Sequence, residues 1–81
     1  MDMPCVRVRR VGERWGVTQK GLDWFLAEFA SWQDAIDYAR GVAVASENSV
    51  VEGEDFLGRV SIRQLFTRDA SGVIHVQSLS F

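Results

Sequence analysis

Hydrophobic and polar residues alternate at the start of the chain in a pattern that predicts a β-hairpin. Two strands are expected over residues 5–11 and 14–19. Gly12, followed by a glutamate, fits a two-residue type II′ turn, which takes glycine first. With this turn Val8 lies opposite Val17, and side chains alternate between two faces. The inner face carries Val6, Val8, Arg10, Trp15 and Val17, and the outer face carries Arg7, Arg9, Val11, Arg14, Gly16 and Thr18.

An aromatic-rich segment and a helix are expected next. Residues 24–29 suit a short third strand, with Phe25, Ala27 and Phe29 pointing inward. Ser31, with an acidic residue three positions later, predicts the N-terminus of a helix that ends near Asn48. The apolar stripe of this helix consists of Trp32, Ala35, Ile36, Ala39, Val42, Ala43 and Ser46.

The last third of the chain predicts a second hairpin. Residues 50–58 are interpreted as an acidic connection, and strands follow over 59–68 and 73–79. A three-residue loop with a glycine bulge sets Phe66 opposite Val76. One face then carries Val60, Ile62, Phe66, Ile74 and Val76, and the other carries Ser61, Arg63, Leu65, Thr67, His75 and Gln77.

These elements predict a single α+β domain over residues 1–81. We expect an antiparallel sheet of about five strands, in the order ββ-β-α-ββ, with the helix packed on one face. A composition of 47% hydrophobic and 25% charged residues is that of a globular protein. One cysteine allows no internal disulfide, and the chain has neither a signal-peptide pattern nor a membrane-spanning apolar run, so a cytoplasmic location is expected.

Enzymatic chemistry is not expected from this sequence. His75 is the single histidine, and its position on an outer strand face favours a surface role over catalysis. Cys5 is interpreted as a small strand residue, although a neighbouring arginine would lower the pKa of a reactive thiol. Glu52, Glu54 and Asp55 lack the spacing of a calcium loop and are interpreted as solvated. No metal, cofactor or small-molecule ligand is inferred.

The uneven distribution of charge suggests two possible functions. Formal charge is −2 in total, but it is +3 over residues 1–20, −7 over 21–58 and +2 over 59–81. Arginines on the outer sheet face are candidates for binding phosphates or single-stranded nucleic acid, or for an interface. These candidates are Arg7, Arg9, Arg14 and Arg63.

Self-association or binding of another protein is the leading hypothesis. An open sheet face or an edge strand gives a small domain a route to a homodimer. The expected apolar contribution comes from Trp24, Leu26, Leu65, Leu79 and Phe81.

Three segments also carry a resemblance to a known group of proteins. They read GERWGV, FASWQDAIDYARGVA and FTRDASGVIHV. In these features the chain resembles a small bacterial family of uncharacterised proteins with a Gly-x-Trp-x-Val hairpin, an Ala-Ile-x-x-Ala-Arg helix and a C-terminal hairpin. This resemblance implies no catalytic residues.

Overall fold

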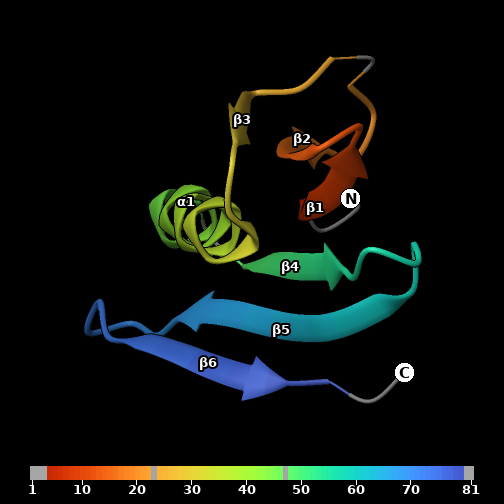
Figure 1. Ribbon diagram of the computed structural model, residues 1–81. Coiled ribbons are helices and arrows are strands. Elements are labelled where there is room, and N and C mark those ends of the chain that lie inside the picture. The colour runs from red at the N-terminus through yellow and green to blue at the C-terminus, as the bar shows by residue number, and fades with distance from the viewer. Residues whose placement is uncertain (1–3, 23, 47, 80–81) are drawn as a thin grey trace.

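The computed structural model describes residues 4–22, 24–46 and 48–79. Six strands and one helix are formed within these ranges (Figure 1). The strands lie in the sheet order β3-β2-β1-β4-β5-β6. The elements are β1 (Cys5–Val11), β2 (Arg14–Gln19), β3 (Ala27–Phe29), α1 (Trp32–Ala45), β4 (Ser49–Glu54), β5 (Val60–Arg68) and β6 (Ile74–Ser78).

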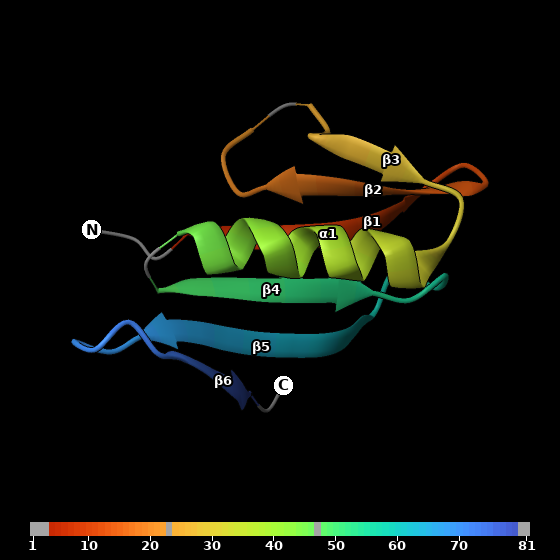
Figure 2. The same cartoon turned by 90° about the vertical axis from the view of Figure 1, so that its left-hand side faces the viewer.

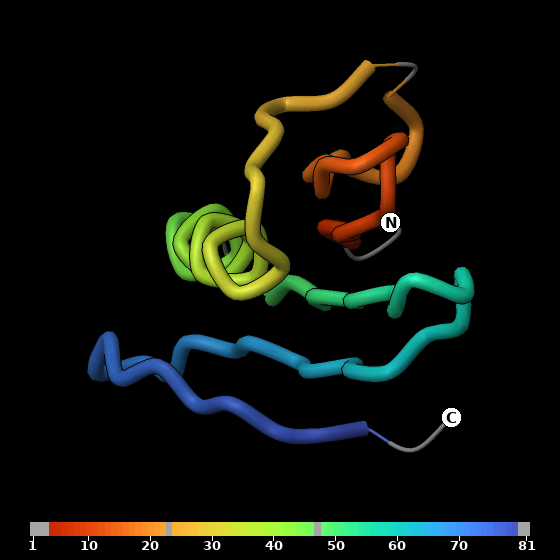
Figure 3. Tube along the Cα trace, in the orientation of Figure 1, coloured from red at the N-terminus to blue at the C-terminus, as the bar shows by residue number. Residues whose placement is uncertain are grey.

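The helix covers only part of the sheet. Figure 2 shows α1 in front of β1 and β4, with β5 and β6 extending beyond it. The tube in Figure 3 shows the sheet curling around the helix from β4 through β1 and β2 to β3. The C-terminal hairpin is therefore attached through β4 and receives little cover from α1.

The first hairpin confirms the predicted register. Val8 pairs with Val17, and Arg10 pairs with Trp15. Gly12 has a φ of +61°, which the first position of a type II′ turn requires and which glycine adopts without strain. Val8 and Val17 are fully buried, so the inner face was identified correctly.

The third strand is shorter than predicted. Only Ala27–Phe29 pairs with β2, with Phe29 opposite Trp15. Phe29 does point inward and contacts Tyr38 of the helix, with ring centroids 5.4 Å apart. The inward placement of Phe25 was wrong. It lies outside the strand, and its ring packs over the outer side of Gly16, where a side chain would meet the Phe25 ring carbon Cε1 at 2.6 Å.

The helix begins as predicted and ends earlier. Ser31 is the N-cap, and its hydroxyl accepts a hydrogen bond of 3.1 Å from the backbone N–H of Asp34. The C-cap is Ser46, whereas Asn48 follows in a left-handed conformation with a φ of +47°. Within the predicted apolar stripe the fully buried residues are Ala35, Ile36, Ala39 and Ala43.

The acidic connection is the main error of the sequence-based prediction. Ser49–Glu54 forms β4, which lies between β1 and β5 near the middle of the sheet. Strands β1 and β4 are parallel, so the sheet is mixed and six-stranded rather than antiparallel with about five strands. The direction follows from the chain path: β3 runs parallel to β1, and α1 returns the chain to the end from which β1 starts. The coarser prediction of an α+β fold with one helix is confirmed.

The second hairpin also has the predicted register. Phe66 pairs with Val76, and Arg68 pairs with Ile74. Gly72 closes the turn with a φ of +88°. The Asp69 carboxylate Oδ1 accepts backbone hydrogen bonds from Ser71 at 2.9 Å and Val73 at 3.0 Å, which holds the loop in an Asx-type turn.

The core lies between α1 and the inner faces of β1, β2 and β4. Gly53 allows close packing there, because a Cβ at this position would lie 2.8 Å from Ile36 Cδ1 and 3.3 Å from Trp32 Cζ2. The buried apolar residues are Cys5, Val6, Val8, Val17, Ala35, Ile36, Ala39, Ala43, Val51 and Phe66.

Candidate interaction surfaces

The face of the sheet opposite α1 is called here the open face. It carries the arginines predicted to lie together, and strand alternation places Arg7, Arg9 and Arg14 on it with Arg63. The prediction missed Glu52 and Glu54, which β4 places between these arginines on the same face. The surface that was inferred to be basic therefore contains both arginines and glutamates. This set of alternating charges, Arg7, Arg9, Arg63, Glu52 and Glu54, is called here the charge ladder.

Ion pairs connect β1, β4 and β5 across the open face. Glu52 contacts the Nε of Arg7 at 3.4 Å and the Nε of Arg63 at 3.3 Å, and Glu54 contacts the Nε of Arg9 at 3.0 Å. The two Glu52 separations exceed the roughly 2.7–2.9 Å of strong charge-assisted hydrogen bonds, so these attractions are mainly coulombic. The Glu52 side chain is only 13% exposed and is shared by two cations.

Aromatic side chains lie beside this ladder at the β2 end of the sheet. Trp24 is 61% exposed, and Phe25 covers the outer side of β2. Both line a hollow of about 190 Å³ with Arg9, Thr18 and Leu22. The Thr18 hydroxyl donates a hydrogen bond of 3.1 Å to the backbone oxygen of Trp24, which ties this loop to the open face.

The predicted apolar interface residues do not form one patch. Trp24 and Leu26 are exposed near β2 and β3, whereas Leu65 and Leu79 are half-buried at the β5–β6 end. Strands β1 and β4 separate the two groups. Phe81 lies outside the described residues.

The two edge strands of the sheet differ in their protection against pairing. β3 has three residues and carries the exposed Glu28, so it is a short and charged edge. β6 has five residues, IHVQS, with no acid, lysine, arginine or proline. Its central residue, Val76, is 53% exposed. Of the two edges, β6 is the one without the usual protecting features.

Alternating hydrogen bonds fix which backbone groups β6 leaves free. Leu79 N–H donates to the Arg63 oxygen at 2.9 Å, and Asp69 N–H donates to the Val73 oxygen at 3.0 Å. In an antiparallel pair, every second residue bonds to the neighbouring strand. Odd-numbered residues of β6 therefore bond to β5, and the even-numbered residues direct N–H and C=O toward the free edge. These even-numbered residues are Ile74, Val76 and Ser78.

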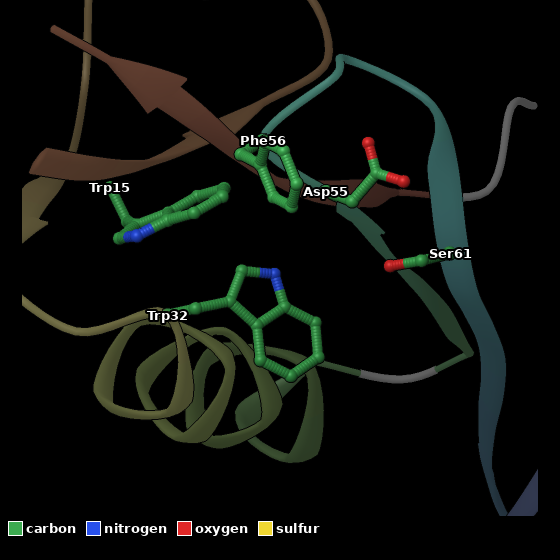
Figure 4. Close-up of a pocket in the computed structure, with 5 residues that line it drawn as sticks. All are labelled: Trp15, Trp32, Asp55, Phe56 and Ser61. Atoms are coloured by element: carbon green, nitrogen blue, oxygen red, sulfur yellow. The ribbon is translucent and has the colours of Figure 1, made fainter. Parts of the chain in front are cut away.

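A second pocket lies on the helix side of the sheet, close to the start of α1. It has a volume of about 320 Å³ and is lined by Trp15, Trp32, Asp55, Phe56 and Ser61 (Figure 4). Side-chain alternation and helical spacing predict inward positions for Trp15 and Trp32, whereas Asp55 is expected in a solvated acidic cluster. The five lining residues come from β2, α1, the turn between β4 and β5, and β5 itself, so local patterns do not predict that they meet.

The remaining chemical candidates, Cys5 and His75, lie on β1 and β6. Burial is the main cause of the raised pKa of Cys5, and nearby Glu52 adds to it, so the thiol form is favoured despite the neighbouring Arg7. His75 has an acidic neighbour, since its Nε2 lies 2.9 Å from Asp69 Oδ2. Both side chains are exposed on the second hairpin.

No group of three or more His, Cys, Asp or Glu side chains suited to holding a metal ion occurs in residues 4–22, 24–46 and 48–79. The helix of this part of the chain, α1, is too short to cross a bilayer.

Comparisons of the chain with models of known families, with curated proteins and with solved structures gave no match. The resemblance to the small bacterial family therefore stays a prediction.

Proposed function

We propose that this protein is a self-association module in which β6 pairs with β6 of a second copy. The observation that carries this proposal is the free edge of β6, which contains no acid, lysine, arginine or proline. Unpaired N–H and C=O groups along such an edge are a template for strand addition. The shorter, acidic β3 edge offers a poorer template.

A two-fold axis at Val76 satisfies the free backbone groups. Antiparallel pairing about this axis sets Val76 opposite its own copy and Ile74 opposite Ser78 of the second copy. The three resulting residue pairs each exchange two backbone hydrogen bonds, because all three residues face the free edge. The interface is self-complementary, as a two-fold dimer requires.

The side chains of β6 suit a second copy as its partner. Ile74 packs against the core, and Val76 pairs with the buried Phe66, so both side chains lie on the helix side of the sheet. Val76 is nevertheless 53% exposed, because α1 gives β6 little cover. Pairing two edges brings these apolar side chains together across the axis. No pair of like permanent charges meets in this register, because His75 faces Gln77 of the second copy. A single strand pair buries less than a standard interface of about 1,600 Å², so a weak, concentration-dependent dimer is expected.

Sedimentation velocity tests this proposal. We expect the wild-type protein to shift from monomer to dimer between about 10 µM and about 500 µM, a range suited to a weak interface. Val76→Lys places two cations at the axis and should keep the protein monomeric. Val73→Lys is the matched control, since Val73 is also 53% exposed but lies in the turn outside the paired residues. A wild-type monomer throughout, or equal dimerisation of Val76→Lys, refutes the proposal.

Binding of single-stranded nucleic acid is a second candidate function, favoured by the hollow that joins Arg9 to Trp24 and Phe25. Exposed aromatic rings beside a cation suit base stacking with phosphate contact. The glutamates on β4 oppose it, because they neutralise part of the basic charge. This function predicts salt-sensitive binding of an oligonucleotide that is lost in Arg7→Glu plus Arg9→Glu. Absence of binding at low salt refutes it.

A further inference from the structure

Three aromatic side chains from distant parts of the sequence converge on one pocket. Figure 4 shows Trp15, Trp32 and Phe56 around a common space, with Asp55 and Ser61 at its other side. The pocket volume of about 320 Å³ falls within the range of roughly 300–1,000 Å³ that is usual for small-molecule sites. None of these residues belongs to β6, so ligand binding here does not depend on self-association.

The walls of the pocket are held in place by hydrogen bonds. Trp32 Nε1–H donates to the backbone oxygen of Glu54 at 3.1 Å, which fixes the indole ring against the end of β4. The Asp55 Oδ1 accepts hydrogen bonds from the backbone N–H of Leu57 at 2.9 Å and of Arg59 at 3.0 Å. The site is therefore formed without a ligand, and binding requires little reorganisation.

The aromatic rings and the acid that line the pocket favour a positively charged ligand. Aromatic rings attract cations to their electron-rich faces. The charged side chain among the lining residues is Asp55, an acid. Arg10, a cation next to Trp15 on this side of the sheet, is bonded through its Nε to the oxygen of Gly12 at 2.8 Å. The pocket thus offers rings and a carboxylate to a ligand of positive charge.

We propose that this pocket binds a methylated ammonium group. An unmethylated ammonium carries three N–H donors, and a wall made mainly of rings leaves most of them without acceptors. Methyl groups remove that cost, keep the positive charge and add apolar contact with the indoles. A neutral ligand of the same shape keeps the contact but loses the attraction to the rings and to Asp55.

Choline and its neutral isostere 3,3-dimethylbutan-1-ol test this assignment. The indole N–H resonances of the three tryptophans are followed by NMR while each compound is titrated into the protein. Choline should shift Trp15 and Trp32 saturably and leave Trp24 unchanged, because Trp24 lies on the opposite side of the sheet. The alcohol should bind at least about tenfold more weakly. No saturable shift with choline, or equal affinity for both compounds, overturns the proposal.

Two variants assign the binding to this pocket. Phe56→Ala removes a ring that is 66% exposed and should weaken choline binding at least about fivefold without unfolding the protein. Asp55→Asn keeps an oxygen acceptor for the turn but removes the charge, and should weaken binding about threefold at low salt. Trp24→Ala, which removes another exposed ring, is the control. Unchanged affinity in Phe56→Ala refutes the site.

Discussion

Replacing Gly53 by alanine should destabilise the protein, although alanine suits most backbone positions better than glycine. The new Cβ would lie 2.8 Å from Ile36 Cδ1 and 3.3 Å from Trp32 Cζ2, and closer still to Ile62 Cγ2. All three neighbours belong to the packed interface between α1 and the sheet. Overpacking of this kind costs about 1–3 kcal/mol. That is a large part of the roughly 4–12 kcal/mol expected for a domain of 81 residues.

The expected effect is measurable by thermal unfolding. For a chain of this length, 1 kcal/mol corresponds to roughly 6 °C in Tm, so Gly53→Ala should lower Tm by about 6–18 °C. The matched control is Gly41→Ala in α1, where a Cβ has no atom within 4 Å. That substitution should raise Tm by about 3–6 °C, because alanine is favoured over glycine in a helix by roughly 0.5–1 kcal/mol.

Circular dichroism at a fixed low protein concentration avoids a contribution from dimer formation. A double-mutant cycle with Ile62→Ala locates the cause, since the double variant should lose less stability than the sum of the single variants. An unchanged or raised Tm in Gly53→Ala would show that the core accommodates the extra methyl group and would refute the packing argument.

Two further predictions concern charged groups. Glu52→Gln should lower the free energy of unfolding by about 1 kcal/mol, because Arg7 and Arg63 lose a shared, mostly buried carboxylate. Urea unfolding measures this loss. The control is Asp37→Asn, which removes an exposed ion pair with Arg40 at 3.9 Å and should have a smaller effect. Equal losses of unfolding free energy in the two variants would contradict a stabilising role of the Glu52 ion pairs. Hydrogen bonds, chiefly from the Ser71 side chain and then from His75, hold the pKa of Asp69 well below its ordinary value of 3.8. The folded state therefore binds this proton less readily than the unfolded state, and its contribution to stability, present above pH 3.8, is lost as the pH falls below that value. Asp69→Asn should reduce the acid-induced loss of Tm in this range, and an unchanged pH profile would refute the role of Asp69.

Local features of the sequence were sufficient for the two hairpins and the start of the helix. Gly12 and Gly72 define turns whose length sets the register, and a register determines every facing pair along the two strands. Ser31 was identified as the N-cap because its hydroxyl bonds to a backbone group only three residues away. The arginine face followed from the same alternation of side chains.

The candidate sites were predictable only in part. The sequence identified Arg7 and Arg63 as members of one face, but not the glutamate between them. It identified Trp15 and Trp32 as inward-facing residues, but not their meeting with Phe56. Residues 49–54 include Glu52 and Glu54, and these acidic residues led to the prediction of a connection. In the structure, buried and half-buried residues alternate from Ser49 to Glu54, as in a strand.

The sequence by itself determined the two hairpins, the start of the helix and the inner and outer faces of β1 and β2, because turn geometry, capping and side-chain alternation act over a few residues. Only the tertiary structure decided that β4 lies parallel to β1 between two arginine-bearing strands. The same holds for the position of Phe25 over Gly16 and for the free edge of β6. Each of these depends on contacts between residues far apart in the chain, which local patterns do not encode.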